Sequence, residues 1–68
     1  MMAYEELILK ILTGKEWLTT NEIKKEVEKA LKKNIINWHT IHRALTRLES
    51  NNKVQKIEKQ RMILWKKK

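Results

Sequence analysis

The segment from His39 to Arg47 contains the side chains best suited to chemistry at a surface. His39, His42, Arg43 and Thr46 follow one another at intervals of one to three residues. A helix would place His39, Arg43 and Thr46 on its outer side, with His42 and Arg47 at the flanks. No acidic residue occurs between positions 39 and 48. An Arg guanidinium can donate to both O6 and N7 of guanine, and a Thr can contact the methyl group of thymine. The pattern predicts a surface that faces the bases of double-stranded DNA.

Other chemistry for these residues has less support. His39 and His42 are spaced to hold a metal ion, but the chain has no Cys or Asp, and zinc normally takes three or four protein ligands. No nucleophile is placed with a base and an orienting acid, and no Gly-rich phosphate loop occurs. We expect no metal, no cofactor, no small-molecule ligand and no enzymatic activity. The remaining alternative is an ordinary solvated helix face.

Positive charge is concentrated in the second half of the chain. The 68 residues contain 16 Lys and Arg against 8 Glu, a net charge of +8. Residues 1–36 hold seven Lys and six Glu, whereas residues 37–68 hold six Lys, three Arg and two Glu. A charge block confined to one half favours binding of a polyanion, because each phosphate contact releases counterions. A surface that only keeps the protein soluble is the alternative.

Three helices are expected, each with a recognisable boundary. The first covers residues 3–13 and ends at Gly14, which suits a left-handed conformation. The second covers residues 20–33, because Thr19 and Glu22 form a capping box. The third follows Asn37, a favoured N-cap residue. Apolar residues at helical spacing give this third helix its buried stripe: Ile41, Ala44, Leu45 and Leu48.

Two strands, 54–59 and 62–66, should form a hairpin that turns near residues 59–61. Neither Gly nor Asn stands at the tip, so the turn residues do not define the register. Residues 66–68 form a basic tail that we expect to be disordered. Trp17 and Trp65 should pack on the core, while Trp38 could pack at its edge or stack on a sugar or phosphate.

This order of elements resembles the winged helix-turn-helix superfamily. The segment 40–54 looks like a recognition helix followed by the first wing strand, and the segment 18–23 looks like the start of the second helix. The resemblance covers about residues 4–66 and departs from the family at Asn52, where Gly is frequent. It implies a mostly helical α+β fold in one domain, residues 1–68. It also implies a sequence-specific transcription regulator similar to small archaeal or viral ones.

A second set of residues is expected to contact the DNA backbone rather than the bases. Its members are polar or basic and stand at a helix start, at the flank of the third helix or on the hairpin: Thr20, Asn21, Asn37, Arg47, Lys56, Lys59 and Arg61. The N-terminus of a helix attracts a phosphate, and a basic wing can enter the minor groove. The hairpin lysines also protect an edge strand from aggregation.

The first helix carries more apolar residues than one core face needs. Met2, Leu9 and Leu12 lie off or at the margin of its stripe, and exposed apolar residues often mark a partner surface. We therefore predict a homodimer through this helix. The rival functions are a protein–protein interaction module and a binder of RNA or left-handed DNA. No apolar run is long enough to cross a membrane, and the lack of Cys fits a cytoplasmic protein at the nucleoid or on viral DNA.

Overall fold

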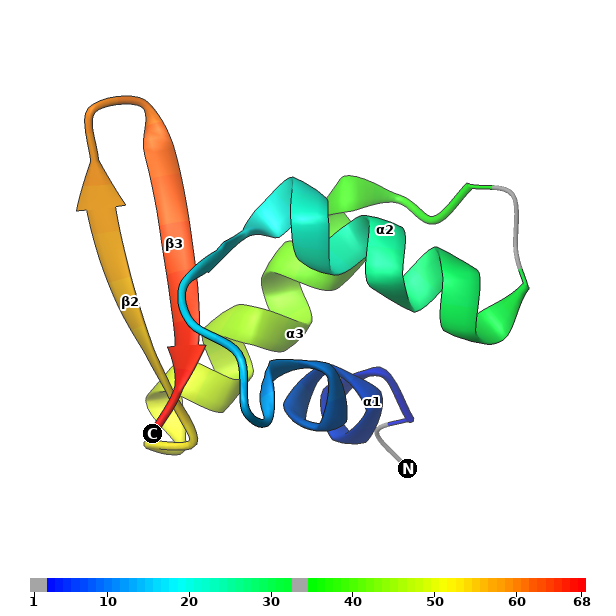
Figure 1. Ribbon diagram of the computed structural model, residues 1–68, viewed down its shortest axis with the longest axis horizontal. Helices are drawn as coiled ribbons and strands as arrows, with labels where there is room; N and C mark the ends of the chain where they lie inside the picture. Colours follow the sequence, from blue (N-terminus) through cyan, green and yellow to red (C-terminus); the bar gives the residue numbers. More distant parts are fainter. Residues whose placement is uncertain (1–2, 33–34) are drawn as a thin grey trace.

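The computed structural model describes residues 3–32 and 35–68. Three helices lie on one side of a small antiparallel sheet (Figure 1). The elements follow in the order α1 (Ala3–Leu12), β1 (Leu18–Thr19), α2 (Thr20–Leu31), α3 (Trp38–Ser50), β2 (Val54–Lys59) and β3 (Met62–Lys67). The expected α+β architecture of three helices and a C-terminal hairpin is therefore confirmed.

The helix starts follow local hydrogen-bonding chemistry. The Thr19 backbone N–H donates to Glu22 Oε1 at 2.8 Å, and the Glu22 N–H donates to Thr19 Oγ1 at 3.1 Å, which is the predicted capping box. At the start of α3, Asn37 Oδ1 accepts from the His39 N–H at 2.7 Å. Both caps satisfy amides that have no partner inside the helix, so they fix where α2 and α3 begin.

Four of the described residues have a positive φ, and they mark the turns between elements. Gly14 (φ 77°) follows α1 and Asn52 (φ 60°) follows α3, as predicted. The left-handed residue after α2 is Lys32 (φ 57°); Asn34, expected in this role, lies outside the described residues. Gln60 (φ 55°) opens the hairpin turn, and a positive φ at this position is usual in two-residue hairpin loops.

The sheet has three strands rather than the two expected. Its order is β1-β3-β2, with β3 in the centre. Leu18 pairs with Trp65, and on the other side of β3 Val54 pairs with Lys67. Because β3 continues to Lys67, residues 66 and 67 are ordered strand residues and not the disordered tail that we expected.

The core lies between the helices and the inner face of the sheet. Its fully buried members come from every helix and from both long strands: Ile8, Leu12, Ile23, Val27, Ile41, Leu45, Val54 and Trp65. Trp65 is 0 % exposed, and its Nε1 donates to Thr20 Oγ1 at 2.9 Å. The prediction for Trp65 is thus confirmed, whereas Trp17 is only half-buried.

The core changes the predicted dimer surface on α1. Leu12 is 0 % exposed, so it is not available to a partner; the helical stripe is wider than the sequence suggested because α1 packs against both α2 and α3. Leu9 is half-buried and packs against the core. Met2 lies outside the described residues. Across residues 3–32 and 35–68, no helix has the length and apolar character needed to cross a membrane.

Candidate nucleic-acid interface

The outer face of α3 presents the predicted base-facing residues. His39, Arg43 and Thr46 are exposed, opposite the stripe that fixes the helix on the core. They lie along one shallow depression with lining residues His39, His42, Arg43, Thr46, Arg47 and Ser50. The Thr46 hydroxyl donates to the His42 carbonyl at 2.9 Å, so its methyl group and its acceptor lone pairs remain for contacts. The structure thus brings the four predicted residues together.

His42 differs from the other three because it is half-buried. Its ring stacks on Trp38, with centroids 4.7 Å apart and planes at 11°, and meets Trp65 edge-on at 6.0 Å. His42 Nδ1 is buried and has no hydrogen-bond partner within the described residues. The ring of His42 therefore packs against the core and supports the exposed face of α3, and it does not project from that face as the other three side chains do. The same stack places Trp38 at the core edge, one of its two expected positions.

Two residues predicted to contact the DNA backbone lie beside acids of other elements. Arg47 Nη1 is 3.7 Å from Glu5 Oε2 of α1, and Lys56 Nζ is 3.7 Å from Glu49 Oε1 at the end of α3. The sequence does not show these pairs. Glu5 becomes a neighbour of Arg47 only when α1 packs on α3, and Glu49 becomes a neighbour of Lys56 only when β2 packs on α3. A DNA phosphate would compete with Glu5 for Arg47.

The start of α2 and the hairpin frame a second groove. Its lining comprises Thr19, Thr20, Asn21, Trp38, Arg61, Met62 and Ile63. Asn21 and Arg61 are both exposed, so two residues predicted separately share one groove. Thr20 is a correction: it is 4 % exposed and its hydroxyl accepts from Trp65, because the first residue of α2 points into the core. Its side chain is structural.

The remaining predicted contacts lie at exposed positions. Lys59 ends β2, and Arg61 lies in the β2–β3 turn at the tip of the hairpin. Asn37 is exposed, with its Oδ1 engaged in the cap of α3, so only its amide N–H groups remain to donate to a phosphate.

The link between α2 and α3 is held by a carboxylate. Glu28 Oε2 accepts from Lys24 Nζ at 2.8 Å and from the Ile36 backbone N–H at 2.9 Å. The hydrogen bond from Lys24 and then that from Ile36 hold the pKa of Glu28 below its usual value, because both donors favour the charged form. The ionised carboxylate of Glu28 thus connects α2 to the residue just before the cap of α3, in addition to the core packing of the two helices.

The arrangement of the elements also matches a protein of known structure. A solved structure from work on the DNA recognition and protein interaction domains of HOP2, and on its homologous DNA pairing properties, superposes with a TM-score of 0.81. The match covers 96 % of this chain and 98 % of that one, with 12 % sequence identity. The chain has the winged-helix fold. No protein-family model and no curated protein sequence matches this winged helix.

Proposed function

We propose that this winged helix binds double-stranded DNA and serves as a sequence-specific transcription regulator, without catalysis. The observation that carries the proposal is the outer face of α3, where exposed His39, Arg43 and Thr46 share a depression that no acidic residue lines. An α-helix fits the major groove, where side chains of these types can distinguish base pairs. The α3 face would then read the bases.

The groove between α2 and the hairpin supports a separate role in holding the DNA backbone. Asn21 lies in the first turn of α2, where free backbone N–H groups attract an anion. Arg61 reaches the same groove from the hairpin, and Lys59 lies beside it at the tip. Contacts of this kind fix the orientation of a protein on the duplex but carry little sequence information.

The similarity to HOP2 favours DNA over RNA and left-handed DNA as the ligand. It also supports one rival function, which is contact with another protein. That structure concerns both DNA recognition and protein interaction, so a protein-contact role is the second outcome of the test. RNA and left-handed DNA are the third. The basic face of α3 favours nucleic acid over protein, since contacts to phosphates are made mainly by cations.

A homodimer through α1 remains part of the proposal. With Leu12 buried, Leu9 is the residue within the described part of α1 that carries this prediction. Two α3 helices in such a dimer would reach successive major grooves about 34 Å apart on an inverted repeat. We also propose that the protein acts at the nucleoid or on viral DNA.

The deciding experiment selects bound duplexes from a random-sequence library and sequences them over several rounds. We expect enrichment of one motif, and competition by unrelated duplex should raise the apparent Kd of that motif only weakly. The library should include RNA hairpins and left-handed duplexes as separate pools. Binding without enrichment would reduce the proposal to nonspecific DNA binding. The absence of duplex binding at low salt would favour the protein-contact rival.

A further inference from the structure

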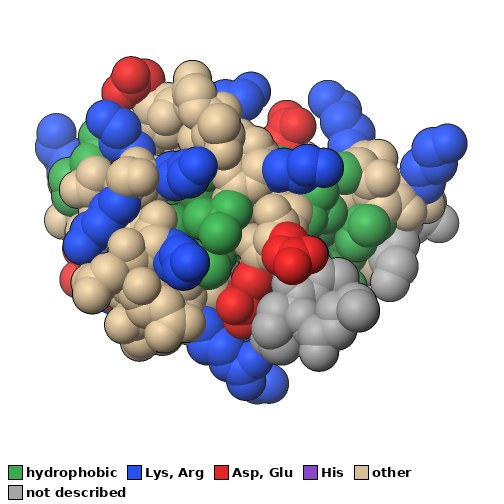
Figure 2. Space-filling view, turned by 90° about the horizontal axis from the view of Figure 1, so that it is seen from below, with side chains coloured by type: hydrophobic (Ala, Val, Ile, Leu, Met, Phe, Trp, Pro, Cys, Tyr) green, Lys and Arg blue, Asp and Glu red, His purple; other side chains and the backbone are tan. Residues whose placement is uncertain are grey.

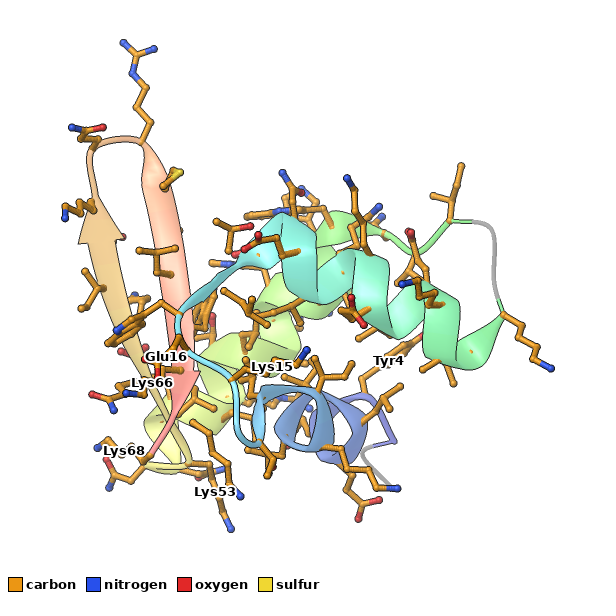
Figure 3. All side chains as sticks on the ribbon, viewed as in Figure 1. Tyr4, Lys15, Glu16, Lys53, Lys66 and Lys68 are labelled. Atoms are coloured by element: carbon orange, nitrogen blue, oxygen red, sulfur yellow. The ribbon has the colours of Figure 1, made fainter. Side chains whose placement is uncertain are left out.

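Lysines from three separate segments surround the end of the sheet that lies away from the hairpin tip. Lys15 stands on the link between α1 and β1, and Lys53 follows α3. Lys66 and Lys67 end β3, and Lys68 follows it. Figure 3 shows Lys53, Lys66 and Lys68 around the lower end of the sheet, with Lys15 on the link beside it. We call these five residues the basal lysines.

Hydrogen bonds hold part of this group in place. The Lys68 backbone N–H donates to the Lys53 carbonyl at 3.1 Å, and Lys68 Nζ donates to Asn52 Oδ1 at 3.4 Å. Lys67 Nζ donates to Thr13 Oγ1 at 3.3 Å. The charges are therefore carried by ordered backbone rather than by a mobile tail, which lowers the entropy lost when they bind a partner.

Acidic residues do little to offset this charge. Glu16 Oε1 lies 3.6 Å from Lys66 Nζ, and the side chain of Glu16 is 87 % exposed. Glu49 borders a nearby polar hollow with Lys68 but lies beside Lys56. Figure 2 shows the molecule from below, and several Lys and Arg side chains lie on the left of this view, at the end of the molecule that holds the sheet. Such a cluster attracts a polyanion.

Four of the five basal lysines lie apart from the surfaces assigned to the first duplex; Lys68 is the exception, because it lines a hollow with Lys56 and with Ser50 of the α3 depression. None of the basal lysines lines the α3 depression itself or the groove between α2 and the hairpin. Strands of six residues separate them from the hairpin tip, a distance of roughly 17–20 Å. A duplex confined to α3 and the tip would therefore leave the other four charges without a phosphate partner.

We propose that the basal lysines form a second surface for a nucleic-acid backbone, so that one molecule holds two DNA segments at once. The inference rests on the proposed binding of the first duplex by α3. Lysine ammonium groups act as point charges toward phosphate, so the second surface should accept any duplex sequence. Its occupancy should fall steeply with added salt.

The test uses two copies of the selected duplex, one carrying biotin and one carrying a fluorophore, at low salt. Wild-type protein should retain the fluorescent duplex on streptavidin beads. The variant Lys15→Gln/Lys53→Gln/Lys67→Gln should show bridging that is reduced about tenfold or more, because three counterion-releasing charges are lost. Its Kd for a single duplex should stay within about twofold of that of wild type.

A matched control removes the same charge from α2 and its C-cap residue. Lys25, Lys29 and Lys32 are exposed, and the triple change of these residues to Gln should leave bridging intact. Equal loss of bridging in both variants would assign it to net charge and overturn the second surface. Circular dichroism checks that both variants are folded.

Each remaining outcome bears on one claim. Bridging that survives in the basal variant would come from a dimer with two α3 faces, and it would overturn this inference. A loss of single-duplex affinity in that variant would mean that the basal lysines touch the first duplex. If wild type binds one duplex but never bridges, the second surface alone fails. If it binds none, the proposed function fails.

Discussion

The carboxylate of Glu28 accepts a hydrogen bond from the backbone amide of Ile36, eight residues further along the chain, at 2.9 Å. Ile36 is 5 % exposed and immediately precedes the cap of α3. This contact therefore connects α2 to the segment that leads into the helix that we propose to read DNA.

The Glu28 contact predicts a dependence of stability on pH. Its folded-state pKa lies below the ordinary value of 4.5, so its contribution to folding is present above pH 4.5 and is lost as the pH falls through the folded-state pKa. Glu28→Gln should flatten this acid dependence in urea unfolding followed by Trp fluorescence. Glu6→Gln, an exposed change on α1, is the control. An unchanged pH profile in Glu28→Gln would contradict the role given to the carboxylate.

The bond between Thr20 and Trp65 predicts a stability effect without an effect on DNA binding. Thr20→Val leaves the buried Nε1 of Trp65 without an acceptor, which should lower the free energy of unfolding by about 1–3 kcal/mol. Thr13→Val, at an exposed position, should change it by about 0.5 kcal/mol or less. The folded Thr20→Val protein should bind duplex DNA as wild type does. A selective loss of affinity would return Thr20 to the DNA interface.

Arg43 should affect sequence preference. Arg43→Ala should cost about 1–3 kcal/mol of binding free energy on the selected motif and little on random DNA, because a base contact carries sequence information. Lys25→Ala removes the same charge from an exposed position on α2 and serves as the control in a fluorescence anisotropy titration. Equal losses on both duplexes would make α3 a nonspecific anchor.

Lys59 should affect all duplexes alike. Lys59→Ala removes a charge at the hairpin tip, so it should lower the slope of log affinity against log salt by about one unit on the selected and the random duplex. The measurement is the same titration repeated over a range of salt concentrations. A slope that does not change would place Lys59 away from the phosphates.

The homodimer can be tested through Leu9. Leu9→Glu should convert a dimer into a monomer in sedimentation experiments while the helical circular dichroism signal persists. Lys10→Glu, an exposed change at the next position, should leave the dimer assembled. Wild-type protein that sediments as a monomer at micromolar concentrations would remove the dimer from the proposal.

The features that could be read from the sequence are those decided by nearby residues. The Thr19–Glu22 capping box and the Asn37 cap involve residues at most three apart, and the stripe of α3 follows from its period. The same local logic placed Arg43 and Thr46 on an exposed face.

The features that were missed depend on residues far apart in the chain. The pairing of Leu18 with Trp65 spans 47 positions, and a strand of two residues has too short a pattern to be recognised. Leu12 and Thr20 were assigned to the surface because a helical period does not show how many neighbours a helix will have. The pair of Arg47 with Glu5 was missed for the same reason.

The central position of β3 has a consequence for how the chain acquires its structure. Residues 62–67 pair with strands on both sides and supply the buried indole of Trp65, so neither the sheet nor the core can close before they arrive. During synthesis, the helices could complete their core only after this segment has left the ribosome, and the sheet and core would then form in one step. Contacts of such long sequence separation slow the folding of small domains, and a protease that removed residues 62–67 would take the centre of the sheet with them.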